Sequence, residues 1–101
     1  MTSMPMRTIT LVALLFASAT ACDGRRATRD DCRQILDRLV DLELRERGFH
    51  DPTLAARWRA EAQATHAADL AACEGQRIPH TALACVRSAT SSEEISHRCV
   101  R

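Results

Sequence analysis

The sequence has very few aromatic residues, no lysine and only three glycines. Tyrosine is absent, and the aromatic residues are Phe16, Phe49 and Trp58. Aromatic side chains bury more surface than most others, so a core built almost without them needs another source of stability. Three glycines are too few for a phosphate-cradling loop. No segment alternates apolar and polar residues with the period of a strand, so the pattern predicts a helical protein.

The charge is nearly balanced, with 14 basic and 13 acidic residues. This balance argues against the basic surface by which proteins bind nucleic acid. All the basic residues are arginines, whose guanidinium groups can recognise phosphate or carboxylate. They are scattered along the chain, however, and many have an acidic residue at helical spacing, such as Asp41 with Arg45. The codon bias of a GC-rich genome explains them more simply than a binding site does.

The first 21 residues have the three parts of a secretory signal peptide. Arg7 supplies the positive charge, an apolar run follows from Ile9 to Phe16, and small residues occupy 17–21. The apolar run is shorter than the roughly 20 residues that a transmembrane helix needs. We therefore expect residues 1–21 to be a signal peptide that is removed from the mature protein.

The end of this leader, Ala19-Thr20-Ala21-Cys22, resembles the lipobox of bacterial lipoproteins, with Ala19 where that motif most often has leucine. The resemblance implies that Cys22 is lipidated on its sulfur, becomes the new N-terminus and is acylated again, palmitate being a typical chain. It also implies a bacterial cell-envelope location, facing the periplasm or the exterior, and membrane lipid as a partner. The same residues fit the A-x-A site of ordinary signal peptidase, which would release a soluble secreted protein.

The number of cysteines favours lipidation. If Cys22 carries lipid, an even set is left that can pair fully in an oxidising compartment. The mature chain of about 80 residues would bury only about 60 to 65% of its surface, and a core of that size usually needs covalent links. We therefore expect disulfides among the other four cysteines: Cys32, Cys73, Cys85 and Cys99.

Residues 22–29 contain no large apolar side chain and are expected to form a solvated tether, followed by one domain at 30–101. The spacing of apolar residues predicts a first helix over 31–47, capped by Asp30 or Asp31 and ended by Gly48. The apolar residues of this face recur three and four apart: Cys32, Ile35, Leu36, Leu39, Val40 and Leu42.

Asp51 and Pro52 predict the start of a second helix, which should run to Cys73 or Glu74. Nine alanines make it a strong helix former with thin side chains, and Trp58 is expected to be its one large core anchor. Its expected inner side is Leu54, Trp58, Ala62, Thr65, Leu70 and Cys73.

Two short helices are expected after the break at 75–77. Pro79 predicts the start of the first, and overlapping capping boxes at Thr90-Ser91-Ser92-Glu93-Glu94 predict the start of the second, with Ile95 and Cys99 on its inner face. The expected fold is therefore all-α: a small disulfide-stapled bundle of about four helices, two long and two short.

Four cysteines allow three pairings, and helix geometry ranks them. Our preferred pairing is Cys73 with Cys85 and Cys32 with Cys99. The second choice is Cys32 with Cys73 and Cys85 with Cys99. It ranks lower because, at 1.5 Å per residue, Cys85 would lie about 7 Å before the Thr90 turn and Cys99 about 13 Å beyond it.

A metal or redox module is the alternative use of these cysteines. His80, Cys85, His97 and Cys99 are close in sequence, but none has the spacing of a zinc site, and no C-x-x-C pair indicates a reactive thiol. The serines near His97 are typical of helix caps. The sequence therefore predicts no catalytic residue, no metal site and no cofactor.

The function that the sequence favours is a non-catalytic interaction or structural module, tethered to the envelope and in contact with another envelope protein. Phe49, Trp58, Arg57 and Arg59 would form the contact surface if Trp58 faced outward. Packing of Trp58 in the core is the simpler expectation.

Overall fold

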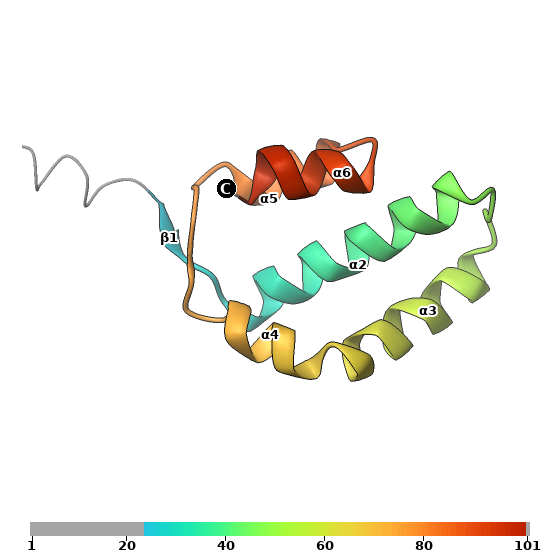
Figure 1. The fold of residues 1–101 in the computed structure, drawn as a ribbon, viewed down its shortest axis with the longest axis horizontal. Coiled ribbons are helices and arrows are strands. Elements are labelled where there is room, and N and C mark those ends of the chain that lie inside the picture. The colour runs from blue at the N-terminus through green and yellow to red at the C-terminus, as the bar shows by residue number, and fades with distance from the viewer. Residues whose placement is uncertain (1–23, 101) are drawn as a thin grey trace, which may run out of the picture.

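The computed structural model describes residues 24–100, which form a mostly helical domain with two disulfides. Helix α2 (Arg29–Glu46) runs through the middle. On one side lie α3 (Pro52–Thr65) and α4 (Ala67–Cys73), and on the other lie α5 (Ala82–Ser88), α6 (Ser92–Glu94) and the π-helix η1 (Ile95–Cys99) (Figure 1). A helical fold is thus confirmed, with α2 as the element that both sides share.

The first helix begins two residues earlier than its spacing predicts, because Thr28 rather than Asp30 or Asp31 is the N-cap. The Thr28 hydroxyl accepts a hydrogen bond from the Asp31 amide (3.1 Å), and the Asp31 carboxylate accepts one from the Thr28 amide (2.8 Å). This reciprocal pair is a capping box. At the other end Gly48 has φ +87°, and the Phe49 amide bonds the Leu44 carbonyl, so Gly48 ends the helix as predicted.

The second predicted helix is interrupted at His66, which separates α3 from α4. Asp51 caps α3 and Pro52 is its first residue, as expected. Neither α3 nor α4 contains a buried residue. These two helices, here called the arm (residues 52–73), therefore touch the buried core only at its edge, where the partly buried Leu70 and Cys73 pack against it.

The buried residues form two clusters on the opposite side of α2. One joins the start of α2 to β2 (Arg77–Ile78) and α5 through Ala27, Cys32, Ile78, Ala82 and Leu83. The other joins the end of α2 to α5 and η1 through Leu42, Val86, Ala89, Ile95 and Cys99. Ile35 packs against both clusters. The predicted inner positions Ile95 and Cys99 are confirmed as buried.

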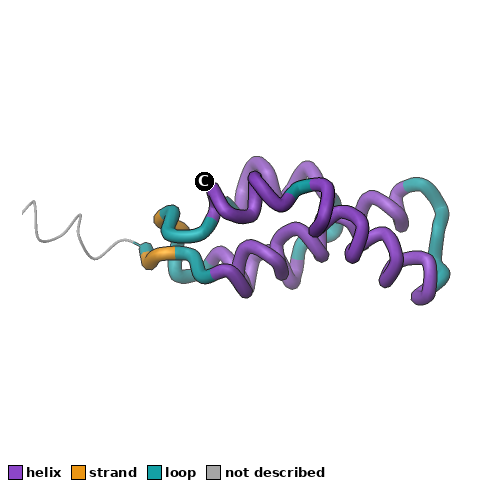
Figure 2. The backbone as a smooth tube through the Cα atoms, turned by 90° about the horizontal axis from the view of Figure 1, so that it is seen from below, coloured by secondary structure: helices purple, strands orange, loops and turns teal. Residues whose placement is uncertain are grey.

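Residues 24–28 are part of the fold, which differs from the solvated tether expected for 22–29. Strand β1 (Arg25–Arg26) pairs antiparallel with β2, and Ala27 is buried. Backbone pairing and the Arg25–Asp31 ion pair hold this segment, so it needs no large apolar side chain. Figure 2 shows the strand pair at one end of the domain and the loop after α2 at the other. Residues 22 and 23 lie outside the described part.

Both disulfides differ from our preferred pairing and agree with the second choice. Cys32 pairs with Cys73 (Cα–Cα 6.1 Å), and Cys85 pairs with Cys99 (Cα–Cα 5.4 Å). The argument against Cys85–Cys99 assumed α-helical rise after the Thr90 turn. The last helical segment instead begins at Ser92, two residues later than assumed, and its final five residues form a π-helix, so Cys99 lies less far beyond the turn than an α-helix from Thr90 would place it.

Candidate functional site

The most prominent concave surface of the described residues is an apolar groove between α2 and the arm. Its volume is about 580 Å³. The Cys32–Cys73 disulfide lies in its wall near the strand pair, and the groove extends along α2 as far as Arg47. At 1.5 Å per residue, that stretch of α2 is about 22 Å long.

Each of the two walls of the groove carries a pair of apolar residues four positions apart. Leu36 and Val40 are four residues apart on α2, and Trp58 and Ala62 are four apart on α3. Residues four apart lie on the same face of a helix, so each helix turns one apolar strip toward the groove. Leu36 and Val40 belong to neither buried cluster and stay partly exposed. Leu36 and Val40 therefore add apolar surface that the core does not use to a wall that also contains the core-packed Ile35 and Leu39.

Trp58 lines the groove and remains 45% exposed, so its predicted role as a core anchor is wrong. Of the predicted inner face of the second helix, Ala62, Thr65, Leu70 and Cys73 also line the groove, whereas Leu54 does not. The alanine-rich arm is too thin to close the space above α2. An exposed tryptophan beside partly exposed leucine and valine is typical of the centre of a protein-binding surface.

Polar contacts hold α3 along α2. Arg59 forms an ion pair with Asp41 (2.7 Å), and the Gln63 amide donates to Asp37 (2.8 Å). Asp41 therefore pairs across helices rather than with Arg45 as its spacing predicts. Arg59 is engaged in the same ion pair, so it is not free for the contact surface that was predicted for the case in which Trp58 faces outward.

The rim of the groove carries more acidic than basic groups. Glu43, Glu61 and Asp69 line it, against Arg47 as the single arginine. His66 Nδ1 lies 3.0 Å from the Asp69 carboxylate. Within residues 24–100, Glu43 and Glu61 form no ion pair. The groove is thus apolar in its walls and negative at its edges.

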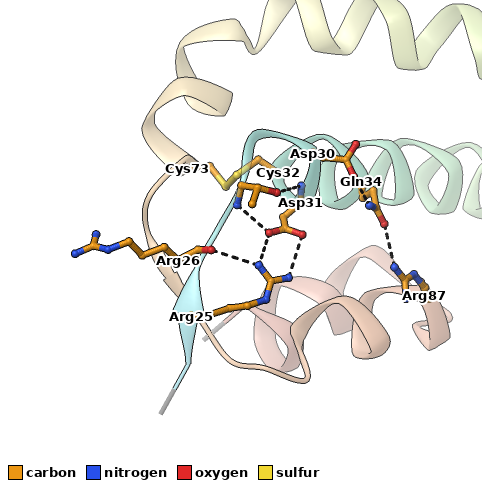
Figure 3. A network of polar contacts seen from close by, with 9 residues as sticks. Arg25, Arg26, Asp30, Asp31, Cys32, Gln34, Cys73 and Arg87 are labelled. Carbon is orange, nitrogen blue, oxygen red and sulfur yellow. Dashed lines mark hydrogen bonds and ion pairs between the residues drawn. A yellow bond between two sulfur atoms is a disulfide. The ribbon is translucent and has the colours of Figure 1, made fainter. Parts of the chain in front are cut away.

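A polar network fixes the end of the domain nearest residue 22. Arg25 binds Asp31 through both guanidinium nitrogens, the Nη2–Oδ1 distance being 3.0 Å, and Asp31 also receives the Thr28 amide (Figure 3). These hydrogen bonds hold the pKa of Asp31 well below its usual value, and the bond from Arg25 has the largest effect. The first residues of the domain are consequently attached rigidly to α2, next to the Cys32–Cys73 disulfide.

The other predicted site residues fall into three sets: the four domain cysteines, Cys22, and Phe49 with Arg57. The four cysteines of the domain are all paired, and the described residues contain no cluster of histidine, cysteine or carboxylate groups suited to a metal ion. Cys22 lies outside the described residues. Phe49 and Arg57 are exposed but do not line the groove.

The groove was missed at the sequence level, although one signal was present. The apolar stripe of the first helix includes neighbours, 35 with 36 and 39 with 40, and is wider than one packing partner requires. In the structure Ile35 and Leu39 pack against the core and also line the groove, while Leu36 and Val40 line the groove only. A stripe of that width indicates two apolar sides.

Comparisons with known proteins gave no match to a family model, to a curated protein or to a solved structure. Among the described helices, none combines the length and apolar character that crossing a membrane requires.

Proposed function

We propose that this chain is a bacterial lipoprotein whose helical domain binds another protein of the cell envelope through the groove between α2 and the arm. Cys22 carries the lipid, and acyl chains such as palmitate hold the protein at a membrane, facing the periplasm or the exterior. The domain acts by binding and carries out no catalysis.

The anchor is supported by the cysteine count. The sequence has five cysteines, and the two disulfides use four of them. Cys22 is left over, directly after a leader whose end resembles a lipobox. Paired cysteines fit an oxidising compartment such as the periplasm.

The binding role is carried by one observation, the open apolar groove with Trp58 at its edge. Burial of Leu36, Val40 and Trp58 by a partner would remove apolar surface from water and stabilise a complex. Proteins that recognise helices often use a groove of this kind between two of their own helices. The volume of about 580 Å³ is also within the range of small-molecule sites, so the partner has to be tested directly.

Site-specific photo-crosslinking in cells tests this role. A photoreactive residue in place of Val40, inside the groove, should give a discrete protein adduct. The same residue in place of Ala84, exposed on α5 and away from the groove, is the matched control. Adducts of equal yield at both positions, or no adduct at Val40, would refute groove binding.

A further inference from the structure

We infer that the occupant of the groove is an amphipathic helix of the partner protein, with an apolar face flanked by arginine or lysine. This inference rests on the proposed function and specifies the partner's chemistry. It combines the helical spacing of the walls, the length of the groove and the charge of its rim.

The walls fit a helix. Two apolar strips with residues four apart, 36 with 40 and 58 with 62, leave a channel in which a third helix can place its own apolar row. The stretch of α2 that lines the groove is about 22 Å long, which matches about 15 residues, or four turns, of a partner helix. Such a helix would complete a three-helix arrangement that α2 and the arm leave open.

The rim selects the charge of that helix. Glu43 and Glu61 are without an ion-pair partner among residues 24–100, and Asp69 adds a third carboxylate against the single Arg47. Basic residues beside the apolar row of the partner would lie opposite these carboxylates. Complementary charge at a rim raises the association rate and excludes acidic competitors.

The same rim disfavours a second copy of this chain as the occupant. In a symmetric dimer that joined groove to groove, the two acidic rims would meet, and like charges in contact oppose association. An acyl chain would fill the apolar walls but would leave the carboxylates without a partner. A cationic helix is the occupant that uses both features.

The test uses the full chain in nanodiscs and three synthetic 15-residue helical peptides without tryptophan. The peptides share one leucine row and differ only in flanking residues: arginine, glutamine or glutamate. Trp58 is the only tryptophan of the protein and lines the groove, so its fluorescence reports occupancy directly. The arginine peptide should bind at least tenfold more tightly than the glutamate peptide, with the glutamine peptide between them, and higher salt should narrow the difference.

Charge removal supplies the matched variants. Glu43→Gln combined with Glu61→Gln should weaken the arginine peptide about threefold to tenfold, as expected for two exposed ion pairs, and should strengthen the glutamate peptide. Glu93→Gln, an exposed acid outside the groove, should change neither.

Equal affinity for the three peptides, no binding of any of them, or a dimer that forms through the groove would overturn the inference. A groove-specific adduct in cells together with charge-independent peptide binding would leave the proposed function intact and reject only the basic helix. If the photoreactive residue in place of Val40 gave no protein adduct in cells, the proposed function itself would be rejected.

Discussion

At the residue scale, Asp31 stands out because its carboxylate accepts hydrogen bonds from two separate segments of the chain. Its carboxylate accepts from both Arg25 nitrogens and from the Thr28 amide, and the residue is buried, with 7% of its surface exposed. An unpaired buried carboxylate would be unfavourable, and these contacts, the Arg25 hydrogen bonds most strongly, stabilise its ionised form and lower its pKa. One residue therefore joins the helix cap, strand β1 and the start of α2.

Asp31→Asn should lower the free energy of unfolding at pH 7 by about 1 to 3 kcal/mol, because the charged contacts to Arg25 are lost. The pKa of Asp31 is lower in the folded protein than in the unfolded one, whose value is near 3.8. Its contribution is therefore complete above about pH 5 and is lost as the pH falls below 4 toward the folded pKa. Urea unfolding between pH 2 and 7 measures this.

The variant should show a flatter decline of stability below pH 4 than the unmodified protein. Asp30→Asn, at the exposed neighbouring position, should change stability at pH 7 by no more than about 0.5 kcal/mol. Parallel pH profiles for Asp31→Asn and the unmodified protein would contradict this role for Asp31.

At the element scale, the arm lies along α2 through partly exposed contacts and one covalent link. It has no buried residue, and its side-chain links to α2 are the Arg59–Asp41 ion pair, the Gln63–Asp37 hydrogen bond and the Cys32–Cys73 disulfide. Partly exposed polar pairs contribute little to stability. The disulfide is therefore the contact that keeps the groove wall in place.

We expect backbone amides of the arm to exchange with deuterium faster than those of 82–99 in the unmodified protein, because α3 and α4 contain no buried residue whereas 82–99 does. Replacing Cys32 and Cys73 together with alanine should increase exchange in 52–73 most. Loop closure assigns about 4 kcal/mol to this disulfide and about 3 kcal/mol to Cys85–Cys99. Peptide-resolved exchange mass spectrometry measures both expectations.

The matched variant replaces Cys85 and Cys99 with alanine, which should increase exchange in 82–99 instead. If a variant fails to fold, the comparison of exchange rates between the arm and 82–99 in the unmodified protein still tests the prediction. Equal protection of the arm and of α5 in the unmodified protein would show that the arm has a stability of its own.

At the scale of the whole molecule, the buried core and the groove lie on different sides of α2. The buried clusters lie between α2, α5 and η1, and the groove lies between α2 and the arm. β1 attaches the chain at Gly24 to the end where α2 begins. There an added side chain would meet the Ile78 carbonyl at 2.7 Å, and φ is +91°, so only glycine fits. A lipid on Cys22, two residues earlier, would place this end toward the membrane.

Cys22→Ser should move the protein from the membrane fraction to the soluble fraction without changing its two disulfides, because the four domain cysteines pair with one another. Intact-mass analysis of the unmodified protein from membranes should show an acylated N-terminal cysteine and a mass four hydrogens below the reduced form. Ala84→Ser, at an exposed position of α5, controls for expression and handling. An unmodified Cys22 peptide from the mature protein would contradict lipidation and favour the secreted soluble alternative.

Local signals in the sequence determined several of the helix ends, although the cap at Thr28, the break at His66 and the start of α5 at Ala82 were not predicted. Pro52 and Gly48 act through their own backbone preferences, and the Ser91–Glu94 cap forms over three residues, so each could be predicted without knowledge of the rest of the chain. The same holds for the buried positions Ile95 and Cys99, which follow from helical spacing.

Only the tertiary structure decided the partners of these elements. The cysteine pairing depends on how far η1 rises along α5, the capture of Arg25 depends on the position of Asp31, and the exposure of Trp58 depends on how closely a thin arm approaches α2. These are relations between segments distant in sequence, and small changes in rise or separation decide them. The groove exists for the same reason: α2 is apolar on two sides, and the chain supplies a buried core for only one of them.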